Sequence, residues 1–281
     1  MSKLSKNRGF SLIELVAVIV ILGVLATATT QYIIFGTEIY IQSSERQKVL
    51  TQSRFLVERL TREIRTAIPN SIRVSSNNAC LELVPIKASG AYREDALVGA
   101  PPINPNVSTG QLDVISWDRN TFENGDRIYI YATDISDIYD STNDLNDNFA
   151  ILNTLSGTSP EYSIDLVQVF GQEDVFADAS PITRFFTADH SVNFCFISNG
   201  TNYDVYRFES TNFSPGQTVP VNANGILMAE GLTNTLATEP PFEYLDIAQT
   251  KNSVVNLYLE FEANQSENMF FNHEVHIPNV P

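Results

Sequence analysis

The feature that most constrains this chain is an apolar run near its start. From Leu15 to Thr37 the sequence contains no Asp, Glu, Lys or Arg, and as a helix those 23 positions reach about 34 Å. That length crosses a hydrocarbon core of about 30 Å, and it exceeds the apolar core of a cleaved secretory signal. Lys3, Lys6 and Arg8 precede the run without any acid. The positive-inside rule therefore predicts a single-pass helix with a cytoplasmic N-terminus.

One carboxylate, Glu14, lies at the start of the apolar run. A plain membrane anchor does not need it, because ionisable groups in lipid are costly and usually have a partner. The stretch GFSLIE, from Gly9 to Glu14, resembles the N-terminal signal of type IV pilins and pseudopilins. That signal reads Gly-Phe-Thr-Leu-x-Glu before an apolar run, and here Ser11 replaces the commoner Thr.

The resemblance implies a processing pathway and a set of partners. A prepilin peptidase would cut between Gly9 and Phe10, which makes residues 1–9 a leader peptide, and Phe10 would then be N-methylated. Glu14 would pair with the N-terminal amine of a neighbouring subunit during filament assembly. Further implied partners are other minor and major pilins, the inner-membrane assembly platform, and membrane lipid before extraction. The implied location is the inner membrane, with a periplasmic head, and then a pilus or pseudopilus filament.

The helix is expected to continue beyond the membrane. Its predicted range is 10–68, membrane-spanning to about residue 37, since Pro69 disfavours a helical residue before it. The apolar residues after Glu38 follow a helical period: Ile39, Val49, Leu50, Leu56, Val57, Leu60, Ile64 and Ile68. Three charged pairs at i,i+4 support the opposite face: Arg54/Glu58, Glu58/Arg62 and Arg59/Glu63.

From residue 69 to 281 the pattern predicts a β-rich head, so the fold class is α+β. Val255, Leu257, Leu259 and Phe261 alternate with polar residues, as in a half-buried strand. Two more strands are expected at 112–117 and 127–131, and a hairpin spans 192–208. Its Asn199-Gly200 pair favours a tight type I′ turn. Long loops are expected at 88–105 and 133–148.

Two further stretches narrow the resemblance. Residues 53–74 look like the helix exit of J-type pseudopilins and their pilus relatives. Residues 272–281 look like the C-terminus of minor pilins of the mannose-sensitive haemagglutinin (MSHA) type IV pilus. The expected function is a minor pilin of such a pilus, which helps to initiate or cap the filament. The alternatives are a J-type minor pseudopilin of a type II secretion system, and a membrane-tethered adhesin or sugar-binding domain.

Cys80 and Cys195 are the only cysteines. Both lie in strand-like segments, and a head outside the inner membrane meets an oxidising compartment. We expect a disulfide that closes a loop of about 115 residues, worth about 4–5 kcal/mol in the chain-entropy model. Two buried free thiols are the alternative.

No other residues form a convincing catalytic or metal site. His273 and His276 are three apart in a strand-like run, so their rings are expected on opposite faces, and His190 has no recognisable partner. The acidic loop 133–148 is expected to be solvated, with calcium binding as the alternative; its carboxylates are Asp134, Asp137, Asp140, Asp144 and Asp147. An enzyme and a cofactor are not expected. Nucleic-acid binding is not expected either, because 33 acidic residues face 17 basic ones.

Overall fold

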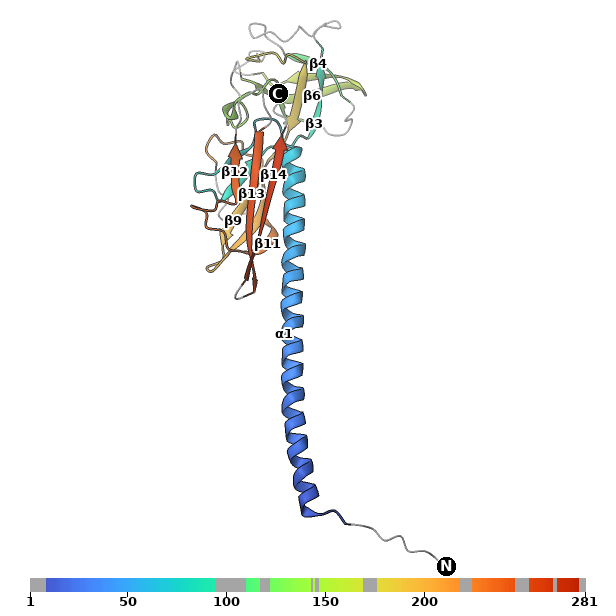
Figure 1. Cartoon of the computed structure of the whole chain (residues 1–281). Helices are drawn as coiled ribbons and strands as arrows, with labels where there is room; N and C mark the ends of the chain where they lie inside the picture. Colours follow the sequence, from blue (N-terminus) through green and yellow to red (C-terminus); the bar gives the residue numbers. More distant parts are fainter. Residues whose placement is uncertain are drawn as a thin grey trace, which may run out of the picture.

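The computed structural model describes residues 9–93, 110–116, 122–142, 144, 147–168, 176–217, 224–245, 253–264 and 267–277. Figure 1 shows one long helix, α1, with the β-rich head packed along its C-terminal part, and the N-terminal part of the helix extending away from the head. The α+β class expected from the sequence is confirmed. Residues 1–8 of the predicted leader and the C-terminal residues 278–281 lie outside the described residues, as do residues 94–105 of the first predicted loop.

Helix α1 spans Leu12–Arg65, slightly less than the predicted 10–68. Its end differs from the prediction because residues 66–68 bond to the head instead of continuing the helix. The Ile68 N–H donates to the Val84 carbonyl at 2.8 Å, and the Ile86 N–H donates to the Thr66 carbonyl at 2.9 Å. The chain thus leaves the helix directly into contacts with the head before Pro69 is reached.

The head contains an antiparallel sheet that packs against α1. Its strands are β1 (Arg73–Val74), β2 (Cys80–Leu83), β9 (Ser191–Ser198), β10 (Tyr203–Ser210), β11 (Ile226–Leu232), β12 (Phe242–Leu245), β13 (Ser253–Asn264) and β14 (Glu267–Ile277). The strand order is β1-β2-β9-β10-β11-β13-β12, and β14 pairs with β13 along its length. In Figure 1 this sheet runs alongside the upper half of the helix, and β14 is the labelled strand next to the helix.

A closed six-stranded barrel forms the other part of the head. Its order is β3-β4-β7-β6-β5-β8, from β3 (Ala88–Tyr92), β4 (Gln111–Ile115), β5 (Arg127–Tyr129), β6 (Phe149–Thr158), β7 (Glu161–Leu166) and β8 (Arg184–Ala188). The whole barrel is inserted between β2 and β9, which are neighbours in the sheet. The predicted loop at 88–105 is therefore wrong at its start, because Ala88–Tyr92 pairs with both β4 and β8. Among its described residues, the predicted loop at 133–148 has the 3-10 turn η1 (Ile135–Asp137) and no other helix or strand.

The core lies between the apolar face of α1 and the apolar face of β13. Leu56, Leu60 and Ile64 are fully buried on one face of α1, as the helical period predicts. They join Leu257 and Leu259 of β13 in one apolar cluster. Every second residue of β13 from Val255 to Phe261 is fully buried, so the predicted alternation is confirmed.

The predicted hairpin is present as β9 and β10, but its turn differs from the prediction. Ser198 pairs with Tyr203, so four residues from Asn199 to Asn202 connect the strands. The Asn199 side chain accepts hydrogen bonds from the N–H groups of Thr201 and Asn202 at 3.2 and 2.9 Å. Only Gly200 of this turn has a positive φ, 103°, whereas a type I′ turn needs two such residues. The amide side chain of Asn199 thus stabilises a wider loop.

Candidate functional site

The predicted cleavage position lies just before the helix. Gly9 and Phe10 have no regular secondary structure, and Phe10 is 78 % exposed. A Cβ atom built on Gly9 would meet no heavy atom within 4 Å. The fold therefore leaves the Gly9–Phe10 bond accessible and does not itself require glycine at position 9. A requirement for glycine would have to come from the peptidase.

Ser11 and Glu14 form a capping box at the start of α1. The Ser11 hydroxyl accepts from the Glu14 N–H at 3.3 Å, and the Glu14 carboxylate accepts from the Ser11 N–H at 3.1 Å. Such a box satisfies N–H groups that have no partner within the helix. Our sequence interpretation gave Glu14 an intermolecular role alone and missed this local one, although the spacing Ser-x-x-Glu before an apolar run is the signal for it. In the single chain, the Glu14 carboxylate already has a hydrogen-bonding partner.

The first half of α1 and the residues just before it present an apolar surface that none of the described residues covers. Phe10, Leu12, Ile19 and Ile33 are each more than half exposed. By length and composition this helix is able to cross a membrane. Figure 1 shows that the head contacts only the other half, so the apolar half is free to enter lipid or to pack with other helices.

A buried ion pair fixes the second half of α1 to the sheet. Nε of Arg207, on β10, lies 3.0 and 3.1 Å from the two carboxylate oxygens of Glu63. Arg59, one turn before Glu63, also pairs with it, and Nη1 of Arg207 lies 2.6 Å from Glu209. Burial alone would lower the pKa of Arg207, but the hydrogen bonds to Glu209 and Glu63 outweigh it and raise that pKa overall. The four charges thus stabilise one another across the interface between helix and sheet.

Cys80 and Cys195 are bonded to each other, which confirms the expected disulfide. They are direct cross-strand partners on β2 and β9, with Cα atoms 4.2 Å apart. This separation matches a non-hydrogen-bonded antiparallel pair, where side chains approach most closely. Both residues are fully buried, against Phe208. Because the barrel is inserted between β2 and β9, the bond closes the loop that contains it.

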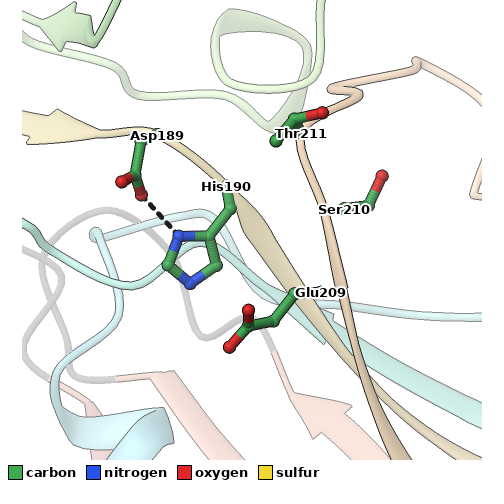
Figure 2. Close-up of a pocket in the computed structure, with 5 residues that line it drawn as sticks. All are labelled: Asp189, His190, Glu209, Ser210 and Thr211. Atoms are coloured by element: carbon green, nitrogen blue, oxygen red, sulfur yellow. Dashed lines mark hydrogen bonds and ion pairs between the residues drawn. The ribbon is translucent and has the colours of Figure 1, made fainter. Parts of the chain in front are cut away.

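A cavity of about 510 Å³ lies where β8 leads into β9, lined by Asp189, His190, Glu209, Ser210 and Thr211. Figure 2 shows the His190 ring between the carboxylates of Asp189 and Glu209, with Nδ1 hydrogen bonded to Asp189. Partial burial raises the pKa of Asp189, but its contacts with His190 and Lys87 outweigh this effect and lower it overall. The hydrogen bond from Arg207 lowers the pKa of Glu209. Our sequence interpretation did not identify the partner of His190, although Asp189 precedes it directly in the sequence.

Three carboxylates beside this cavity have the spacing of a metal site, but a lysine lies among them. Oxygen atoms of Glu123, Asp126 and Asp189 lie within 4.8 Å of one another. Nζ of Lys87 lies 3.2, 2.8 and 3.1 Å from these three residues in turn. Burial opposes the charge of Lys87, yet these three carboxylates outweigh it and raise its pKa. The ammonium group provides the positive charge that these carboxylates need, between the barrel and the sheet.

The carboxylates of the predicted calcium loop make local hydrogen bonds. Asp134 accepts from the Ser136 N–H and Asp137 from the Thr133 N–H, at 2.9 and 2.8 Å. Asp140 and Asp147 accept in the same way from the N–H groups of Thr142 and Asp144. Asn143, Leu145 and Asn146 of this loop lie outside the described residues. Calcium binding in this loop stays a prediction.

The two C-terminal histidines lie on β14, as the sequence pattern predicts. His273 pairs with Leu257 and is partly buried, whereas His276 pairs with Val254 and is exposed. A spacing of three along a strand sends side chains to opposite faces. These two rings therefore do not converge on a shared ligand.

One known protein family matches the chain, and it matches the segment whose geometry is described above. The family of the prokaryotic N-terminal methylation motif matches residues 4–30. The match covers Lys6 and Arg8 of the basic head, then Gly9, Phe10, Glu14 and most of the apolar run. It supports a protein of the type IV pilin or pseudopilin kind, which is processed by prepilin peptidase and assembles with other pilins. No curated protein and no solved structure matches the chain.

Proposed function

We propose that this chain is a minor pilin of an MSHA-like type IV pilus and that it helps to initiate or cap the filament. The observation that carries the proposal is the methylation motif at the start of an uncovered apolar helix, whose other half is fixed to a β-rich head. The finer resemblance is to the minor pilin MshO and depends on the helix exit and the C-terminal stretch. The role is structural, without catalysis or a cofactor.

Low copy number follows from the size of the head. A head of about 210 residues is bulky for a subunit repeated along a thin filament. Glu14 bears on position, because a subunit at the extreme tip has no neighbour above it whose amine it must recruit. Since Glu14 is present, we place this chain beneath at least one other minor pilin.

The runner-up is a J-type minor pseudopilin of a type II secretion system, which the resemblance of residues 53–74 favours. Both functions share insertion with a cytoplasmic N-terminus, processing by prepilin peptidase and extraction into a filament. Deletion of the gene separates them. Loss of surface pili with normal secretion supports the pilus, and loss of secreted enzymes with normal pili supports the secretion system.

A further inference from the structure

The outer face of the second half of α1 carries a stripe of positive charge. Arg54, Arg62 and Arg65 lie at positions i, i+8 and i+11, which share one face of a helix. All three are exposed, on the side of the helix opposite the buried Leu56 and Leu60. Phe55 lies at the margin of this stripe and is 52 % exposed. We call Arg54, Arg62 and Arg65 the basic stripe.

The basic stripe is not used within the subunit. In the part of the chain that the structure describes, the three guanidinium groups have no hydrogen bond, ion pair or ring contact. Other cations on α1 behave differently, since Arg46 pairs with Glu267 of β14 and Lys48 pairs with Glu230 of β11. The cations that bind the head to its own helix are thus distinct from the three that face outward. One acid, Glu58, accompanies the stripe and leaves it with a net positive charge.

The stripe and the uncovered apolar surface lie on one helix. No break in α1 separates Leu12 from Arg65. A partner that covers the apolar half in lipid or in a filament, and then continues along the stripe, must itself be a long helix. A head alone lacks the apolar extension for this, so the partner is another helix that crosses the membrane in parallel.

A second copy of this chain is a poor partner on this face. Two parallel copies packed through the same face would bring Arg54, Arg62 and Arg65 of one helix against the same residues of the other. Like charges at facing positions are destabilising and select against that pairing. A helix that is apolar in its membrane half and acidic beyond it would meet the stripe with opposite charge.

We propose that the basic stripe is the docking surface for the parallel helix of a different, acid-bearing subunit, and that it disfavours self-association of this chain. The proposal rests on the proposed function, because it names the kind of neighbour that this pilin-like helix selects. It also gives a physical reason for low copy number. A subunit whose exposed helix face repels its own copy does not propagate through that face.

Disulfide trapping in membranes tests the choice of partner. Thr51 is exposed on the same face, and the chain's only two cysteines are already bonded to each other. Thr51→Cys therefore introduces a single free thiol. The full chain with Thr51→Cys is expressed together with a second, larger-tagged copy that also carries Arg54→Glu, Arg62→Glu and Arg65→Glu. The acid-bearing copy is the probe for the proposed partner, and the mixed and self dimers are resolved by size.

We expect the ratio of mixed to self dimers to exceed its statistical value about fivefold, as a few exposed ion pairs allow, and the excess to fall at high salt. In the control, the second copy carries one charge reversal on the barrel, Arg184→Glu, in place of the reversals on the helix. Its ratio of mixed to self dimers should be the statistical one. Self dimers of the unreversed chain at or above the statistical proportion would overturn the proposal. The assay reads inserted chains whether or not they are cleaved or assembled, so its failure is distinct from a failure of the pilin function.

Discussion

Glu63 of α1 and Arg207 of β10 are ion paired inside the head, with Nε of Arg207 3.0 and 3.1 Å from the two carboxylate oxygens. The residues are 144 positions apart in the sequence, and both are about nine-tenths buried. A filament subunit must keep its helix and head in one orientation while it is extracted from the membrane. This pair supplies a directional, buried contact between the helix and the sheet.

We predict that Arg207→Leu destabilises the head by about 3 kcal/mol, because removal of one partner leaves a buried charge. This figure is at the low end of the usual range, since Glu63 keeps Arg59. The double variant Glu63→Leu/Arg207→Leu should lose less than the sum of the two single changes. Urea unfolding of the full chain in detergent measures both, with Arg184→Leu as an exposed control. Additive losses would contradict coupling between the two residues.

The disulfide gives a second prediction. Cys80→Ser/Cys195→Ser should lower the free energy of unfolding by about 4–5 kcal/mol, because the bond closes a loop of 115 residues. Non-reducing peptide mapping of the unmodified protein should find the two cysteines in one linked peptide pair. Alkylation of both thiols without prior reduction would show that the bond does not form in the cell.

Ser11 and Glu14 allow the capping role of the carboxylate to be separated from its charge. Glu14→Gln retains an acceptor for the Ser11 N–H, since Gln also serves in a capping box, but it removes the negative charge. Ser11→Ala weakens the helix start by about 1 kcal/mol and leaves the charge in place. If Glu14 pairs with a neighbour's amine, Glu14→Gln and Glu14→Ala should both abolish assembly, while membrane level and cleavage stay normal. Ser11→Ala should still assemble.

For each of these variants we would measure the amount of protein in the membrane, N-terminal cleavage and surface filaments. Normal filaments that contain the Glu14→Gln subunit would refute the charge-pairing role. Loss of cleavage would show instead that Glu14 serves the peptidase.

The acidic groups around His190 make the head sensitive to low pH. The pKa values of Asp189 and Glu209 are lowered in the folded protein, so their stabilisation is complete above their unfolded pKa values of about 4. It is lost as the pH falls through the lower folded values. Asp189→Asn should therefore lower the melting temperature at pH 7 and have a smaller effect at pH 3. The exposed Asp178→Asn serves as the control, and an equal effect of Asp189→Asn at both pH values would contradict the account.

Much of the fold could be predicted from local patterns, because periodicity reports which face of an element is buried. Leu56, Leu60 and Ile64 identified the helix face, and Val255 to Phe261 identified a strand. The barrel could not be predicted as a separate unit. It is inserted between β2 and β9, which pair with each other across more than 100 intervening residues, and no local pattern encodes such a pairing.

The site shows the same division. The motif that contains Gly9, Phe10 and Glu14 was recognisable because it is contiguous. The capping box of Ser11 could have been predicted from its spacing, although we missed it. The cage of carboxylates around Lys87 was not predictable. Its members come from three distant segments that only the closed barrel brings together.

The central claim is that this chain is a processed pilin-like subunit, and the mature N-terminus tests it most directly. Mass spectrometry of the protein purified from membranes should find an N-terminal peptide that begins at Phe10 and carries an N-methyl group. The same peptide should be missing from cells without prepilin peptidase. A chain that retains residues 1–9 in cells with active peptidase, and still supports normal filaments or secretion, would contradict the account.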